Sequence, residues 1–193
     1  MSIISFIVLA LALGISAMIL MHRCADAAPI QLSSGLLVSF ALATIHVALF
    51  CLGIYLGNSL RFIDLDNPDA YRKTNALVFL GFAVVVAVKQ LFPHLGRKTR
   101  PAAFDLNAGT FRTLLLSVAT GINGFLLGLG VGYVVLLQDC LHSALWPLWV
   151  ATLLFAYLGI MFGRQHIALR PRRWMGLSSL ILFATALITV IVA

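Results

Sequence analysis

Six separate stretches of about 20 mostly apolar residues occupy most of this 193-residue chain. A helix needs roughly 20 such residues to cross the hydrocarbon core of a bilayer. The connections between the stretches are short, and at 62% hydrophobic and 10% charged residues the composition is not that of a soluble domain. The sequence therefore predicts an all-α integral membrane protein with six transmembrane helices in one domain, residues 1–193. The expected spans are residues 3–22, 33–60, 75–93, 112–137, 144–163 and 174–193.

The basic residues are distributed unevenly between the two sides of this arrangement. Ten of the 13 Lys and Arg residues fall in or beside the first, third and fifth connections, and three fall on the other side. Because cytoplasmic connections carry an excess of Lys and Arg, both termini are expected outside the cell. The basic runs have no interleaved aromatic residues for base stacking, so the net charge of +7 indicates contact with the lipid bilayer and no nucleic acid.

An internal repeat joins the two halves of the sequence. "LGIYLGN" at residues 52–58 matches "LGIMFGR" at residues 158–164 with an offset of 106 residues. "GIS", which ends at Ser16, matches "GIN", which ends at Asn123, with an offset of 107. Since three spans reverse the direction of insertion, the pattern predicts two inverted three-helix repeats, about 1–93 and 112–193, related by a two-fold axis in the membrane plane.

The motifs "ATLLFAYLGIMFGR" (residues 151–164) and "SVATGINGFLLGLGVG" (residues 117–132) resemble the MntP-type manganese efflux pumps of the LysE-like transporter group. The resemblance implies a cation exporter in the bacterial cytoplasmic (inner) membrane. It also implies that two intramembrane Asp positions, which bind the exported cation in that family, correspond to Ser16 and Asn123. A further acidic position of the family corresponds to His46, whose mate at the 106-residue offset is Thr152.

This chain lacks the acidic residues that the family places in its spans. It has no Glu, and its six Asp residues all fall in predicted connections. A hard divalent ion such as Mn²⁺ prefers anionic oxygen ligands, whereas Ser16 and Asn123 offer neutral oxygens. We therefore expect an altered ion-binding site formed by Ser16, His46, Asn123 and Thr152, with the first three as candidate metal ligands.

Packing is the alternative interpretation of these polar residues. Small polar side chains and glycines commonly allow membrane helices to approach closely, and Gly53, Gly57, Gly159 and Gly163 have the spacing for this. His46 is then a neutral histidine held by one hydrogen bond. Gln90, at the cytoplasmic end of its span, is expected to reach the lipid headgroups.

Two functions remain open from the sequence. The first is a divalent cation efflux transporter of the manganese type with an altered cation site. The second is a non-transporting membrane subunit that uses the same fold to assemble with a partner. An enzyme is not expected, because no nucleophile, base and orienting acid can be placed together within the spans. No cofactor is expected, and the candidate partners are a divalent cation, a further copy of the chain and a membrane partner subunit.

Overall fold

The computed structural model describes residues 3–27, 32–60, 68–91, 110–135, 145–167 and 169–193. Across these ranges the regular structure is all helix, with no strand. Every predicted span coincides with one helix, although the first helix ends later and the third begins earlier than expected. The helices are α1 (Ile3–Ala27), α2 (Leu32–Ser59), α3 (Pro68–Leu91), α4 (Thr110–Val134), α6 (Leu145–Arg164) and α7 (Pro171–Val192).

Five of these helices are long and apolar enough to cross a membrane: α1, α2, α3, α6 and α7. Helix α4 contributes a shorter apolar stretch, Gly121–Val134, within the described residues. Side chains as large as Leu, Ile and Phe are exposed on the outer faces of the bundle, for example Leu37, Leu180 and Ile191. An outer surface of this kind is compatible with a membrane protein, because lipid tails and not water would contact it.

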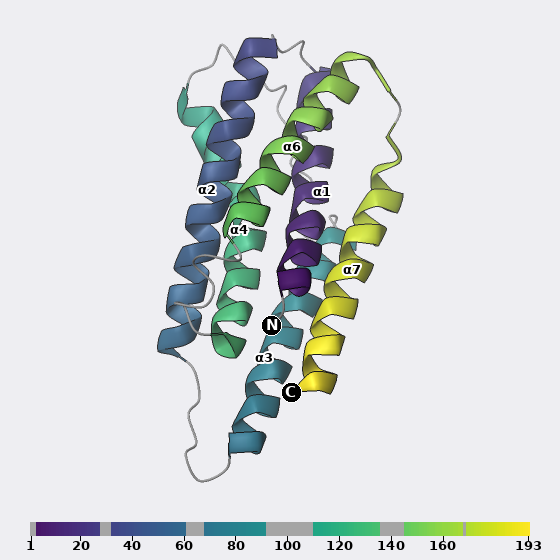
Figure 1. The fold of residues 1–193 in the computed structure, drawn as a ribbon. Helices are drawn as coiled ribbons and strands as arrows, with labels where there is room; N and C mark the ends of the chain where they lie inside the picture. The colour runs from purple at the N-terminus through teal and green to yellow at the C-terminus, as the bar shows by residue number, and fades with distance from the viewer. Residues whose placement is uncertain (1–2, 28–31, 61–67, 92–109, 136–144, 168) are drawn as a thin grey trace.

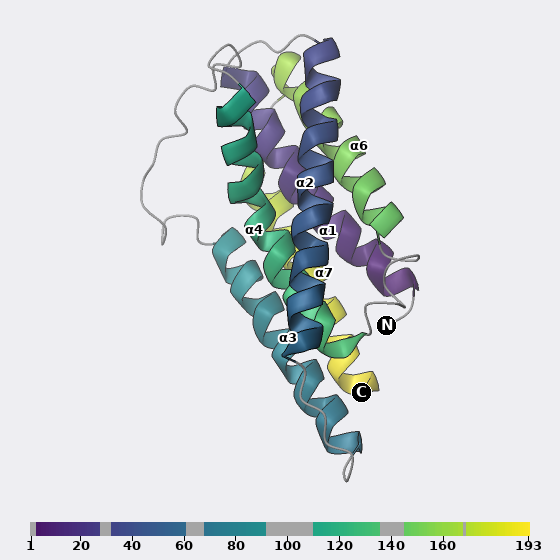
Figure 2. The ribbon, with the colours of Figure 1, turned by 90° about the vertical axis from the view of Figure 1, so that its left-hand side faces the viewer.

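The six helices pack side by side in one elongated bundle (Figures 1 and 2). The C-terminal ends of α1 and α6 and the N-terminal ends of α2 and α4 lie at one end, which we call the basic end. The most extensive contacts join α1 to α6 and α2 to α4. Helix α3 packs on α4 and α7, α7 also packs on α1, and α2 also packs on α6. The contact between α1 and α4 is small, although the repeat predicts that these two helices meet at the centre.

Glycines make the two most extensive contacts possible. A Cβ atom on Gly53 or Gly57 of α2 would come within 3.0 Å of the α4 backbone, and one on Gly159 or Gly163 of α6 would come equally close to α1. Real Cβ atoms do not approach other atoms so closely. The paired helices therefore touch backbone to backbone, as small residues permit in membrane bundles.

Two acidic residues lie inside helices and not in connections, which corrects the sequence prediction. Asp26 is in the last turn of α1 and Asp69 is in the first turn of α3. A carboxylate in the first turn, such as Asp69, interacts favourably with the positive end of the helix dipole. The other four, Asp64, Asp66, Asp105 and Asp139, lie outside the described residues.

At the basic end, the segment after α6 is held against α1. His166 closes α6 with a left-handed backbone (φ 49°), and the amides of His166 and Ile167 donate to Gly163 O and Phe162 O, as in a Schellman cap. The imidazole of His166 lies 3.0 Å from Asp26 Oδ1. His22 Nε2 donates to Ile167 O at 2.8 Å. These contacts fix the start of α7 relative to α1.

Candidate functional site

Gln90, near the end of α3, is the centre of a buried polar cluster that joins three helices. Its Nε2 donates to Ser16 Oγ on α1 at 3.0 Å. Its Oε1 accepts from Ser178 Oγ and Ser179 Oγ on α7, at 3.0 and 3.2 Å. Gln90 is only 5% exposed and Ser178 is fully buried. The prediction that Gln90 reaches the lipid headgroups is therefore wrong, because its amide finds partners inside the bundle.

Each α7 serine of this cluster has two possible hydrogen-bond acceptors but only one hydroxyl proton. Ser178 Oγ is also 2.8 Å from Ala12 O, and Ser179 Oγ is also 3.3 Å from Ala87 O. A hydroxyl has one proton, so each serine donates either to Gln90 or to a backbone carbonyl at any moment. The cluster thus concentrates oxygen atoms that can accept a further proton or a cation.

Asn123 faces the same part of α3 from α4. Gly130 of α4 packs on Phe79 and Phe82 of α3, and α3 and α4 run in opposite directions (Figure 2). Asn123 precedes Gly130 by two helical turns and so lies on the same face of α4. It is therefore directed toward α3 around residues 86–90. Its Oδ1 is buried and has no hydrogen-bond donor within the described part of the chain.

His46 lies on α2 at the height of Asn123, but on a different face of α4. Its Nδ1 is 2.8 Å from Leu42 O, and because a carbonyl only accepts, Nδ1 carries the proton. In the neutral tautomer Nε2 is then the ring atom that accepts. The ring Cδ2 and the carbonyl of His46 lie against Gly124, one residue and about 100° around α4 from Asn123.

Thr152 occupies a separate place: it precedes Gly159 by two helical turns and so lies on the face of α6 that packs on α1, beside the contact of α6 with α2. Trp149 of α6 stacks edge-on against Phe40 of α2 at 5.3 Å, and its Nε1 donates to Thr44 Oγ1 at 3.4 Å. Thr152 of α6 and Ser39 of α2 are the other polar residues of these two helices that bear on the site. Both are fully buried, and neither hydroxyl has a partner among the described residues.

The four candidate residues thus lie in the interior of the bundle at three different contacts. Ser16 and Asn123 are directed toward adjacent turns of α3, His46 lies between α2 and α4, and Thr152 lies between α6 and its neighbours. No group of three or more His, Cys, Asp or Glu residues that could hold a metal ion is present among the described residues. The donors near Ser16 and Asn123 are neutral amides and hydroxyls.

The sequence analysis missed Gln90, Ser178 and Ser179 as members of the site. One signal for the serines was present: two adjacent small polar residues inside an otherwise apolar stretch. Gln90 gave no such signal because it follows Lys89 near a helix end, where long polar side chains usually reach water.

Comparisons with models of known protein families, with curated proteins and with solved structures return no match for this chain.

Proposed function

We propose that the protein is a transporter of a small cation in the bacterial inner membrane, built from two inverted three-helix repeats, with an altered cation site at α3. The site comprises Ser16 and Asn123, as the repeat-related pair, together with Gln90, Ser178 and Ser179. His46 and Thr152 are further polar residues of the bundle interior, at other helix contacts. The observation that carries the proposal is that Ser16 accepts a hydrogen bond from Gln90 near the C-terminal end of α3, while its repeat mate Asn123 has a buried, unpaired Oδ1 on the face of α4 that helix periodicity assigns to α3.

The helix contacts support the inverted repeat. Exchanging α1 with α4, α2 with α6 and α3 with α7 leaves the set of contacting helix pairs unchanged. The glycines of α2 and α6 match at an offset of 106, and the residues they contact on α4 and α1 match at 107. A chance sequence match gives no reason for the matched residues to make matched contacts. The contact residues that match are Phe125 and Met18, Leu129 and His22, and Gly132 and Ala25.

The unpaired oxygens support a site for a transported ion and not only packing. A buried polar atom without a hydrogen-bond partner costs free energy, and the bilayer core holds no water that could satisfy it. Three such atoms, Ser39 Oγ, Asn123 Oδ1 and Thr152 Oγ1, occur in the described interior. Substrate and ion sites of secondary transporters lie near the bilayer midplane at the interface of the repeats.

The neutral donors favour a weakly hydrated or singly charged cation over Mn²⁺. The cost of removing an ion from water rises steeply with its charge, and neutral oxygens offset it less than carboxylates do. The described interior near Ser16 and Asn123 offers hydroxyl and amide oxygens and no carboxylate. Restoring carboxylates at the two repeat-related positions is therefore the sharpest test of the site.

We predict that the double variant Ser16→Asp with Asn123→Asp gains binding and transport of Mn²⁺. Each charge costs roughly 2.5–3.5 kcal/mol at a helix centre, so the variant should be less stable than the wild type without metal. Metal that binds only the folded state should restore this loss by mass action. The measurements are thermal unfolding in detergent with and without Mn²⁺, and Mn²⁺ flux in proteoliposomes, in which Na⁺, K⁺ and proton flux of the wild type are also recorded.

The exchange variant Ser16→Asn with Asn123→Ser is the matched control, because it keeps two neutral polar groups at the same positions. It should show no stabilisation by Mn²⁺. A double Asp variant that gains nothing from Mn²⁺, together with a wild type that carries none of the tested cations, would contradict the proposal. The non-transporting subunit would then be the preferred function.

A further inference from the structure

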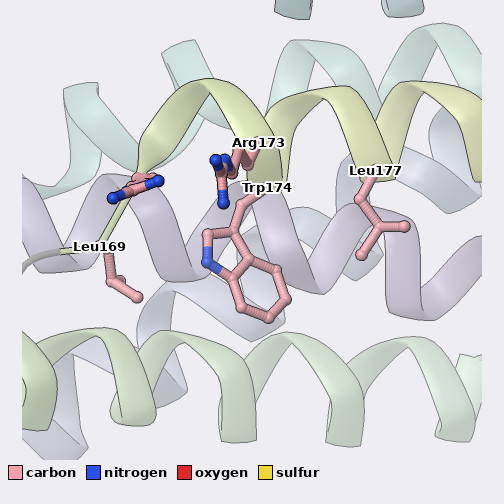
Figure 3. A pocket seen from close by; sticks show the side chains of 5 residues that line it. Leu169, Arg173, Trp174 and Leu177 are labelled. Carbon is pink, nitrogen blue, oxygen red and sulfur yellow. The ribbon is translucent and has the colours of Figure 1, made fainter.

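An open groove lies where α7 begins, on the side of the bundle toward the basic end. It has a volume of about 520 Å³ and is lined by Leu169, Arg170, Arg173, Trp174 and Leu177. Figure 3 shows the side chains of Leu169, Trp174 and Leu177 on the same side of α7. Trp174 is 36% exposed and Leu177 is 45% exposed, although both are large apolar side chains.

The groove is chemically divided along the helix axis. Two guanidinium groups, of Arg170 and Arg173, are at the N-terminal end of α7, and the indole of Trp174 and Leu177 follow toward the apolar middle of the helix. Tryptophan is enriched at the level of lipid headgroups, and arginine pairs with phosphate through two parallel hydrogen bonds. The order of side chains therefore matches a phospholipid, with a phosphate at the arginines and an acyl chain below.

The protein itself leaves the positive charge of the groove uncompensated. Among the described residues, no carboxylate pairs with Arg170 or Arg173. Asp26 is the one described acidic residue at this end, and its Oδ1 is occupied by His166. Arg164 and Arg172 add further positive charge nearby and are exposed.

We propose that this groove is a binding site for an anionic phospholipid, whose phosphate contacts Arg170 and Arg173 and whose acyl chain lies against Trp174 and Leu177. The site depends on the protein residing in a bilayer, but it does not depend on transport. Its position is defined by the contacts of His22 and His166 that fix the segment before α7 to α1. A lipid bound there would bridge this segment and α7.

The test uses Trp174 as a reporter. The chain has three Trp residues, so the variant Trp146→Phe with Trp149→Phe leaves Trp174 as the single fluorophore. The protein is placed in lipid nanodiscs that mix unlabelled lipid with brominated phosphatidylglycerol or brominated phosphatidylcholine, and quenching of Trp174 is measured. One basic residue near a membrane surface contributes about fivefold in affinity for anionic lipid. We expect at least this preference for phosphatidylglycerol, and we expect it to fall as salt is raised.

Replacement of the charges should abolish the preference. Arg170→Gln with Arg173→Gln should quench equally with both lipids, whereas Arg170→Lys with Arg173→Lys should keep most of the preference and shows that the fold tolerates change here. Arg72→Gln with Lys73→Gln, at the opposite end, is the matched charge control and should behave as the parent protein. Equal quenching by both lipids in the parent protein would overturn the proposal. Loss of the preference on addition of inorganic phosphate, at an ionic strength at which sodium chloride leaves the preference intact, would also overturn it and would assign the groove to soluble phosphates.

Discussion

Gln90 illustrates how much one side chain can matter in an apolar bundle. Its amide can make three hydrogen bonds to serines of two other helices, so α1, α3 and α7 are joined at one point. Hydrogen bonds between membrane helices contribute on average about 0.6 kcal/mol each, and two of these compete with backbone carbonyls, so the group stabilises the bundle by at most about 2 kcal/mol.

We therefore predict that Gln90→Met, which keeps the volume but removes the donors and acceptors, lowers the free energy of unfolding by about 0.6–2 kcal/mol, because the serines of α7 keep their backbone acceptors. Lys89→Met, at the neighbouring exposed position, is the control and should have little effect. Unfolding by denaturing detergent in mixed micelles measures both. Equal stability of the two variants would mean that the serines find other partners as readily as Gln90.

At the scale of helices, adding one methyl group to a glycine distinguishes tightly packed positions from open ones. Gly53 and Gly159 are in tight contact with a neighbouring helix, whereas a Cβ on Gly81 or Gly176 would meet no atom within 4 Å. All four glycines are in helices, so the intrinsic helix propensity of the substitution is the same.

We predict that Gly53→Ala and Gly159→Ala each destabilise the protein by about 1–3 kcal/mol, the usual cost of overpacking. Gly81→Ala and Gly176→Ala should be neutral or more stable by up to about 1 kcal/mol, because alanine is the better helix former. The same unfolding assay compares all four. Similar effects at the tight and the open positions would show that the α1–α6 and α2–α4 contacts do not determine stability.

At the scale of the whole molecule, the distribution of charge predicts the orientation in the membrane. Among the described residues, Arg23, Arg164 and Arg170 lie at the basic end, and Arg72 and Lys73 lie at the opposite end. The basic end should therefore face the cytoplasm.

We predict that, in a variant without its native cysteines, Leu60→Cys reacts with a membrane-impermeant maleimide in intact cells. Gln165→Cys should react only after the cells are opened. Both positions are exposed and lie at opposite ends of the bundle. Labelling of Gln165→Cys in intact cells would reverse the proposed orientation.

The helices were predictable from the sequence, and the polar cluster was only partly so. Apolar stretches of about 20 residues have few alternatives to a helix, so each expected span appears as one. The repeat identified Ser16 and Asn123, because both interrupt apolar stretches at matched positions. The partner of Ser16 could not be predicted, because the direction of Gln90 depends on how α3 is placed against α1 and α7. Helix periodicity does not specify that placement.

The backbone contacts of α1 with α6 have a consequence for biosynthesis. Helix α1 leaves the ribosome before α6, and α6, the helix on which α1 packs most extensively, begins only at residue 145. At about 5–20 residues per second, several seconds pass between the synthesis of α1 and that of α6. During this time the hydroxyl and imidazole groups of α1 are already in the membrane. Over their described residues, helices α1, α2 and α3 share no extensive contact with one another, so the first half of the chain reaches its native packing only after α4, α6 and α7 have been inserted.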